Sequence, residues 1–317
     1  MKKTALLFAG QGAQVVGMGK DLAEAHPLAR ALFSQANEAL GYDLARLCFA
    51  GPEPDLTRTE NAQPGIFLVS WIAYRLLMEQ VPGLDFVATA GLSLGEFTAL
   101  AAAGALSFAD GLKTVQQRGR FMEEACAAHR GGMAAIIGLD EGPIRAVCLE
   151  TGVELANLNC PGQLVISGEI DRIQRACELA RVKGAKRALP LPVAGAYHSR
   201  LMAGAQPKLS EVLASLPLQM PAVPVIANVT AQPHGGAEAI RASLVAQVTA
   251  SVRWEESMRW LLAQGCNRFI ELGPGTALSG FMKRIDKNAV VYNVADRPSL
   301  DKTVGLLAAE RASSAGA

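Results

Sequence analysis

The sequence FVATAGLSLGEFTALAAAGAL, residues 86–106, gives the clearest indication of the fold. Its first part is apolar and typical of a strand, and its last part is rich in good helix formers. Between them lies GLSLG, residues 91–95, which matches the G-x-S-x-G pattern of a sharp strand-to-helix turn. The flanking glycines leave space for the tight backbone. Ser93 is therefore a candidate nucleophile, although a glycine turn with an incidental serine would show the same pattern.

Apolar, strand-like runs recur along the chain and alternate with helical stretches. The runs lie at 5–10, 86–91, 134–139, 163–167, 187–193, 224–229, 268–272 and 289–294. The clearest helical stretches are 64–80, 96–106, 109–127, 169–183, 200–215 and 255–264. This alternation predicts an α/β fold with a mostly parallel, buried sheet. The final nine residues are small and polar, and we expect them to fray.

Residues 128–196 have the pattern of a separate unit. In order, they predict a strand, a helix, two short strands, a second helix and a final strand. That βαββαβ order is the ferredoxin-like arrangement. We therefore expect a small ferredoxin-like domain at 128–196, inserted into a large α/β-hydrolase-like domain made of 1–127 and 197–317.

Charge and hydropathy argue against two classes of partner. Lys and Arg number 30 and Asp and Glu 29, so the formal net charge is +1, and no long run of one sign occurs. A nucleic-acid-binding protein would normally show a basic stripe with interleaved aromatic residues, so no nucleic acid is expected. No apolar segment reaches the roughly 18–20 residues that span a bilayer, so no membrane is expected either.

The cysteines and the N-terminal sequence bear on metal binding and location. The 6 cysteines are scattered and form no C-x-x-C pair, which predicts neither a zinc site nor a disulfide framework. The short apolar run at the N-terminus is interrupted by GQGAQ too early for a secretory signal peptide. We expect a cytoplasmic protein, or an organellar one whose targeting peptide has been removed.

A serine hydroxyl needs a neighbouring base to become a nucleophile near neutral pH, and the chain has only 4 histidines. His26 lies at an expected helix boundary, His129 in an expected linker and His234 in a turn-like segment, so each is interpreted as a surface residue. His198 lies where the strand-like run 187–193 ends in a small-residue turn. Loops at strand ends commonly carry the catalytic groups of α/β proteins, which makes His198 the candidate base.

Eight short motifs follow one another along nearly the whole chain. They are FAGQGAQ at 8–14, GLSLGE at 91–96, QRGRFM at 117–122, MAAIIGL at 133–139, NLNCPGQ at 157–163, GAYHSRLM at 195–202, QVTASVRW at 247–254 and ELGPG at 271–275. In this order they resemble the malonyl-coenzyme A:acyl carrier protein transacylases of fatty acid synthesis, which are related to the acyltransferase domains of polyketide synthases. A lone G-x-S-x-G is a weak signal, whereas eight ordered motifs are specific.

The resemblance implies a transferase that works through a malonyl-serine intermediate. Ser93 would attack the thioester of malonyl-coenzyme A, and His198 would accept its proton and later return one to the leaving thiol. The malonyl group would then pass, in a ping-pong reaction, to the phosphopantetheine thiol of an acidic acyl carrier protein. Malonyl-coenzyme A is the substrate, no tightly bound cofactor or metal is expected, and we expect a monomer.

The resemblance also implies roles for residues beyond the Ser–His pair. Arg118 matches the arginine that binds the free malonyl carboxylate, a task suited to a planar guanidinium. The backbone N–H groups of Gln11 and Leu94 would form the oxyanion hole. Backbone carbonyls orient the histidine of this family, and Gln247 corresponds to one member of that network, with Asn159 in a nearby loop. A solvated helix-face arginine and amides bonded to local backbone are the alternative interpretations.

Two further positions bear on specificity. Tyr197 matches an aromatic position that accompanies malonyl preference in the family, which we attribute to a ring that leaves no room for an α-methyl group; core packing is the alternative. Leu92 departs from the histidine that many family members have before the nucleophile. Because His198 is a separate candidate base, we expect the catalytic pair to be retained. Arg120 is expected to face solvent.

Several basic side chains are candidate contacts for an acidic carrier protein, although most such charges are only solvated. They are Lys183, Lys186, Arg187, Lys283, Arg284 and Lys287. A serine hydrolase or thioesterase of the α/β-hydrolase class is an alternative function, but no carboxylate in 94–197 has the strand-end context its triad needs. A subunit of a polyketide or malonate-decarboxylase system, or a docking subunit without catalysis, is a further alternative.

Overall fold

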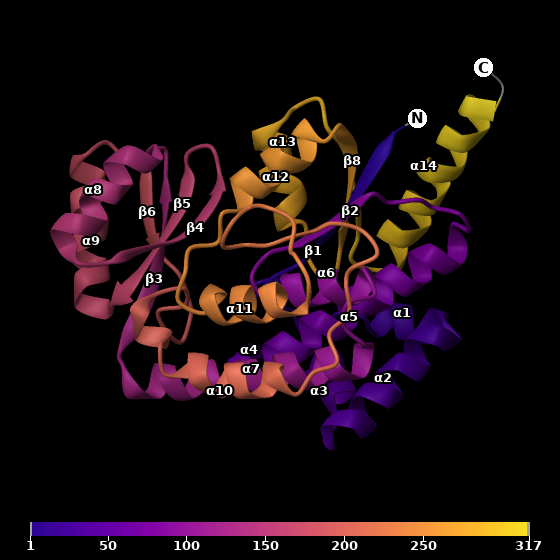
Figure 1. Ribbon diagram of the computed structural model, residues 1–317, viewed down its shortest axis with the longest axis horizontal. Helices are drawn as coiled ribbons and strands as arrows, with labels where there is room; N and C mark the ends of the chain where they lie inside the picture. The colour runs from indigo at the N-terminus through magenta and orange to yellow at the C-terminus, as the bar shows by residue number, and fades with distance from the viewer. Residues whose placement is uncertain (1, 316–317) are drawn as a thin grey trace.

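The computed structural model describes residues 2–315 and contains two sheets with different strand directions (Figure 1). The larger sheet has the order β7-β2-β1-β8-β9, and every neighbouring pair in it is parallel. The second sheet has the order β4-β5-β3-β6, with antiparallel neighbours. The protein is therefore an α/β protein with a parallel main sheet, as the alternation of strands and helices predicts.

The strands overlap the predicted apolar runs, several with shorter bounds, and β4 is one of the two short strands predicted within 128–196. They are β1 (Lys3–Phe8), β2 (Ala88–Gly91), β3 (Gly131–Ile137), β4 (Glu154–Cys160), β5 (Gln163–Glu169), β6 (Arg187–Pro190), β7 (Val225–Ile226), β8 (Cys266–Leu272) and β9 (Val290–Val294). The run 187–193 ends early as a strand because Pro190 and Pro192 lack the N–H that a ladder needs. The run 224–229 keeps only two strand residues, at the edge of the parallel sheet.

The helices include all the predicted stretches, and further helices lie elsewhere. Those at predicted positions are α5 (Thr59–Gln80), α6 (Gly95–Ala102), α7 (Phe108–Ala128), α9 (Ile170–Val182), α10 (Ala205–Ala214) and α12 (Trp254–Ala263). The others are α1 (Lys20–Ala25), α2 (Pro27–Leu40), α3 (Leu44–Ala50), α4 (Glu53–Thr57), α8 (Glu141–Thr151), η1 (Arg200–Met202), α11 (Ala237–Gln247), α13 (Ala277–Ile285) and α14 (Arg297–Ala315). Among these, α8 is the helix predicted after the first strand of 128–196, and η1 begins the predicted stretch 200–215. Within residues 2–315, none of the helices is both long and apolar enough to cross a membrane.

The C-terminal helix corrects one expectation. α14 continues through the segment that we expected to fray. Glu310 on this helix accepts hydrogen bonds from Lys2, Arg268 and Tyr292, which tie it to the start of the chain and to β8 and β9. The prediction of fraying was therefore wrong up to the last described residue, and residues 316–317 lie outside the described part of the chain.

Helices cover both faces of the parallel sheet, and the side chains of β1 divide between two cores. Leu6 and Phe8 pack into a large cluster with α5 and α6, whereas Ala5 and Leu7 pack into a second cluster with α12 and α13. This division follows from the alternation of side chains along a strand. The parallel sheet is buried on both sides, which explains why its strands are apolar throughout.

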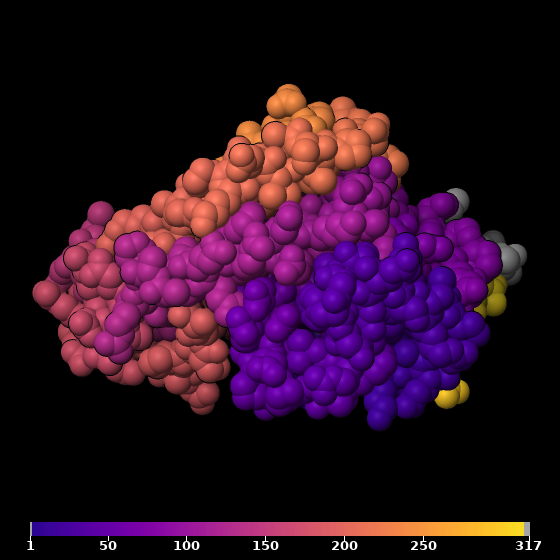
Figure 2. All heavy atoms as spheres, turned by 90° about the horizontal axis from the view of Figure 1, so that it is seen from below, coloured from indigo at the N-terminus to yellow at the C-terminus, as the bar shows by residue number. Residues whose placement is uncertain are grey.

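The antiparallel sheet has a core of its own, covered by α8 and α9. Its elements follow the order β3, α8, β4, β5, α9, β6, which is the order predicted for 128–196. Figure 2 shows this unit and the N-terminal helices at opposite ends of the molecule.

The turn after β2 requires glycine at both of its ends. An ideal Cβ on Gly91 would lie 1.9 Å from the backbone carbon of Gly95, and one on Gly95 would lie 2.3 Å from the carbonyl oxygen of Phe8. Ser93 between them has a φ of 53°, in the left-handed region. The strand–turn–helix prediction for 86–106 is confirmed, and the turn holds the serine at the carboxyl edge of the parallel sheet.

Candidate active site

Ser93 and His198 are brought together across 105 residues of sequence. The Oγ of Ser93 lies 2.8 Å from Nε2 of His198. Both residues are buried, with 8% and 4% of their surfaces exposed. Both also have positive φ, 53° and 58°, an uncommon conformation for residues other than glycine that often occurs at functional sites. The geometry is that of a nucleophile and its base.

A backbone carbonyl holds the other side of the imidazole. Nδ1 of His198 lies 2.9 Å from the carbonyl oxygen of Gln247, at the end of α11. A neutral ring with its hydrogen on Nδ1 donates to that oxygen and presents the Nε2 lone pair to the serine hydroxyl. Burial, together with the positive charge of Arg118, lowers the pKa of His198 to about 4. The ring is therefore in its basic, neutral form near neutral pH.

Arg118, on α7, points its guanidinium at the same serine. Nη2 donates to Ser93 Oγ at 3.2 Å and to Gln247 Oε1 at 2.9 Å, and Nη1 donates to Gln63 Oε1 at 2.8 Å. All three acceptors are neutral, and Nε has no hydrogen-bond partner among residues 2–315. Burial lowers the pKa of Arg118 to about 10, which leaves the group charged at neutral pH. A buried cation with neutral partners is suited to binding a carboxylate.

Close helix packing positions this arginine. Gly119, the next residue, lies against α5, where a Cβ would be only 2.5 Å from the carbonyl oxygen of Thr59. The guanidinium carbon of Arg118 also lies 5.6 Å from the ring centroid of Phe97, on α6. The guanidinium of Arg118 is thus held between α5 and α6, with Nη2 directed at Ser93.

A buried network behind the nucleophile was not predicted from the sequence. Nε2 of Gln247 donates to Glu96 Oε2 at 2.7 Å and to the carbonyl oxygen of Ser93 at 3.0 Å. Asn228 donates its backbone N–H to Glu96 Oε2 at 2.9 Å. The side chain of Asn228 accepts from the N–H of Ser93 at 2.6 Å and donates to the carbonyl of Gly91 at 2.7 Å. The network therefore fixes the backbone of the turn on both sides of the serine.

The interpretation of His234 as a surface residue is wrong. Its side chain is 1% exposed, and its Nε2 lies 2.7 Å from Oε1 of Glu96, whose side chain is 0% exposed. The segment folds back on β7 through a hydrogen bond from the N–H of His234 to the carbonyl of Val225 and through the bridge between Ile226 and Pro233. A turn-like composition describes this local geometry but does not show that tertiary folding buries the ring.

The expected oxyanion donors lie in two turns of the parallel sheet. Leu94 follows Ser93 at the start of α6, and Gln11 lies in the turn after β1. Within residues 2–315, neither backbone N–H donates to a protein acceptor. The side chain of Gln11 lies 3.5 Å from that of Gln63, which also contacts Arg118. Neither N–H group is thus used within the described part of the protein.

Tyr197 and Asn159 are buried, but neither side chain forms a hydrogen bond with Ser93, His198 or Arg118. The hydroxyl of Tyr197 lies 2.6 Å from Oγ1 of Thr59. Asn159 lies on β4 and not in a loop as expected, because β4 continues to a tight turn where Cys160 pairs with Gln163. Oδ1 of Asn159 has no hydrogen-bond partner among the described residues.

The remaining expectations concern residues around this group. Arg120 is exposed and lies 3.7 Å from Glu124, so its prediction is confirmed. Leu92 packs against the core under α12 and α13. His26 and His129 both lie at helix ends; His26 is half-buried and His129 is exposed. Across residues 2–315, no three His, Cys, Asp or Glu side chains gather as a metal site would require.

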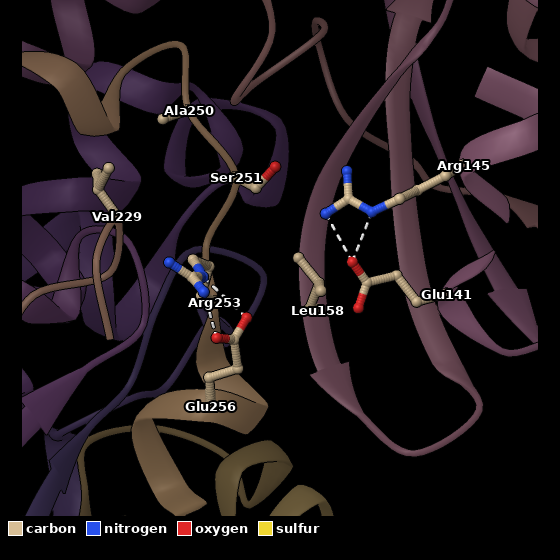
Figure 3. A pocket seen from close by; sticks show the side chains of 8 residues that line it. All are labelled: Glu141, Arg145, Leu158, Val229, Ala250, Ser251, Arg253 and Glu256. Carbon is tan, nitrogen blue, oxygen red and sulfur yellow. Dashed lines mark hydrogen bonds and ion pairs between the residues drawn. The ribbon is translucent and has the colours of Figure 1, made fainter. Parts of the chain in front are cut away.

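A separate cleft of about 330 Å³ lies between the antiparallel unit and the segment that leads into α12 (Figure 3). Its lining residues are Glu141, Arg145, Leu158, Val229, Ala250, Ser251, Arg253 and Glu256. Arg145 pairs with Glu141 at 2.6 Å, and Arg253 pairs with Glu256. The charge of each arginine is thus paired with a glutamate, and none of the predicted site residues lines this cleft.

Comparison with known sequences places this geometry in a family. The family model described as acyl transferase domain matches residues 5–307. The malonyl CoA-acyl carrier protein transacylase of Bacillus subtilis (strain 168) is 45% identical over 315 residues, which are 98% of this chain and 99% of that protein. The enzyme of the same name from Escherichia coli (strain K12) is 42% identical over 289 residues, 90% of this chain and 93% of that protein.

Solved structures agree with the sequence comparison. The malonyl CoA-acyl carrier protein transacylase of Coxiella burnetii superposes with a TM-score of 0.93 at 36% identity, covering 96% of this chain and 97% of that one. A malonyl-transacylase in complex with its type II PKS acyl-carrier protein has a TM-score of 0.93 at 39% identity, with 96% and 99% covered. The chain therefore belongs to the acyl transferase domain family and, within it, to the malonyl CoA-acyl carrier protein transacylases.

Proposed function

We propose that the protein transfers a malonyl group from malonyl-coenzyme A to the phosphopantetheine thiol of an acyl carrier protein, for fatty acid synthesis. The observation that carries this proposal is the buried guanidinium of Arg118, 3.2 Å from the Oγ of Ser93. A serine–histidine pair alone fits hydrolases and transferases alike. A buried cation beside the nucleophile favours an acyl group that has a free carboxylate. The names of the full-length relatives agree with that substrate.

The proposed reaction has two half-reactions that use the same groups. Ser93 Oγ bonds to the thioester carbon while His198 Nε2 takes the hydroxyl proton, and the C–S bond then breaks as that proton passes to the coenzyme A sulfur. In the second half, Nε2 takes the proton of the carrier thiol as its sulfur attacks the ester carbon, and the C–O bond then breaks as that proton passes to Ser93 Oγ. The N–H groups of Gln11 and Leu94 would stabilise the negative charge that develops on the carbonyl oxygen.

The serine hydrolase alternative has less support. A hydrolase triad would place a carboxylate on the imidazole. Glu96 lies between Ser93 and His198 in sequence, but its carboxylate binds Gln247, Asn228 and His234. A polyketide pathway remains the alternative destination of the malonyl group, since one relative was solved with a type II PKS acyl-carrier protein.

Finer features of the fold and substrate site are part of the proposal. The separate core and element order of the antiparallel unit support a ferredoxin-like domain at 128–196 inserted into an α/β-hydrolase-like domain of 1–127 and 197–317. The bond from Tyr197 to Thr59 supports a fixed ring that limits the size of the acyl group. For Asn159, the unpaired Oδ1 supports a role in binding substrate. A monomeric state and a cytoplasmic location stay predictions.

Two of the basic residues predicted to meet the carrier protein, Lys186 and Arg284, lie at the same end of the antiparallel sheet. A Cβ on Gly138 would lie 2.6 Å from Lys186, and one on Gly162 would lie 3.6 Å from Arg284 and 3.8 Å from Gly138. Lys186 and Arg284, far apart in sequence, therefore belong to one exposed area, which we propose, with the neighbouring Lys283, as the docking site for the acidic carrier protein.

Charge reversal tests this docking site. We expect Lys186→Glu combined with Lys283→Glu to raise the KM for the carrier protein by about tenfold, because like charges then face the acidic partner. Loading from malonyl-coenzyme A, measured in the same preparation, should stay unchanged. An unchanged KM for the carrier would remove this area from the proposal.

Intact-mass analysis after mixing with malonyl-coenzyme A tests the nucleophile and the carboxylate site together. The wild type should gain one malonyl group, and Ser93→Ala should gain none. Loading of Arg118→Ala should be slower by on the order of 100-fold, because a charge-assisted contact to the carboxylate is lost. Arg120→Ala is the matched control and should load like the wild type. A malonyl adduct on Ser93→Ala, or normal loading of Arg118→Ala, would contradict the proposal.

The pH dependence of loading tests the role of His198. Its pKa is lowered to about 4, so the neutral base predominates above that value and is lost as the pH falls through it. We expect kcat/KM for loading to be nearly constant between roughly pH 5.5 and 8 and to decrease at lower pH. An acid limb at the ordinary histidine pKa of 6.5 would show that burial does not tune this base.

A further inference from the structure

Arg118 and Glu96 are buried opposite charges that do not touch. Buried charges normally pair directly, because each has lost its solvation by water. Here the side chain of Gln247 stands between them: Nε2 donates to Glu96 at 2.7 Å, and Oε1 accepts from Arg118 at 2.9 Å. The carboxylate of Glu96 therefore lies one side chain away from the guanidinium.

Three donors hold the carboxylate of Glu96 in this position. Oε2 accepts from the backbone N–H of Asn228 at 2.9 Å and from the amide of Gln247 at 2.7 Å. Oε1 is 2.7 Å from Nε2 of His234, its one partner among residues 2–315. An imidazole donates through Nε2 both when it is protonated and when it is neutral with the hydrogen on that nitrogen. Histidine is thus a donor to Oε1 in either charge state.

We propose that His234 is a positioning residue for acyl specificity, which holds Glu96 away from Arg118 and so leaves the guanidinium to the carboxylate of the substrate. The inference rests on the proposed function, since it takes Arg118 as the malonyl site. From its place behind Gln247, the carboxylate still raises the pKa of Arg118 against the larger effect of burial. The cation is thus stabilised without a carboxylate of the protein bound directly to it.

Loss of the donor should turn Glu96 into a competitor of the substrate. Oε1 would have no partner in a buried site, and Arg118 is a neighbouring cation whose Nε lacks an acceptor among the described residues. A direct ion pair between the two would occupy the guanidinium. A malonyl group needs that guanidinium, whereas an acetyl group does not. The effect should therefore be larger for malonyl-coenzyme A than for acetyl-coenzyme A.

Loading kinetics with these two thioesters test the inference. For His234→Leu, we expect a higher KM for malonyl-coenzyme A and a malonyl-to-acetyl ratio of kcat/KM that is lower by about tenfold. His234→Gln retains an N–H donor and should keep the wild-type ratio. His129→Leu, at an exposed histidine, is the matched control. Should His234→Leu fail to fold, His234→Asn, whose shorter side chain does not reach Oε1, takes its place.

The double variant Glu96→Gln with His234→Leu distinguishes positioning from a merely structural role. An amide has no charge with which to pair to the guanidinium, so the malonyl-to-acetyl ratio should recover toward that of the wild type. Equal slowing of both substrates in His234→Leu, an unchanged ratio, or a double variant that does not recover would overturn the inference. If the wild type itself shows no preference for malonyl, the proposed function fails instead.

Discussion

The site depends on one buried positive charge that contacts only neutral oxygens. Arg118 is 1% exposed, and its hydrogen bonds go to two glutamine side chains and to the nucleophile. Burying such a charge costs free energy. The ring of Phe97, the amide oxygens of Gln63 and Gln247 and the more distant carboxylate of Glu96 offset that cost. Because amide oxygens bind a guanidinium less strongly than a carboxylate does, an incoming acyl carboxylate can replace them.

The strained turn at Ser93 is held by the same group of residues. Glycines at both ends allow α6 to begin directly against β1, and Asn228 binds the turn backbone before and at the serine. Gln247 connects the two parts of the site, since its carbonyl orients His198 while its side chain bonds Arg118 and Glu96. Nucleophile, base and cation are therefore positioned by shared hydrogen bonds, and a change in one alters the environment of the others.

Local patterns predicted the parts of the site that have local signatures. The elbow follows from glycine spacing and a strand-to-helix change, and His198 follows from its place at a strand end. Gln63, Asn228 and His234 have no such signature, because a glutamine in a helix or a histidine in a turn acquires its role only through contacts 55 to 138 residues away. The C-terminal segment was misjudged for the same reason, since its helix is anchored by distant side chains on β8 and β9.

The central claim is that the guanidinium of Arg118, which pairs with no carboxylate of the protein, is kept for the carboxylate of the acyl group. A crystal structure of the protein with malonate esterified to Ser93 tests it most directly. The account predicts that the free carboxylate accepts from both terminal nitrogens of Arg118, in place of Gln63 or Gln247, while Glu96 stays on His234. A carboxylate turned away from the guanidinium, or Glu96 paired with Arg118 in the loaded protein, would contradict it.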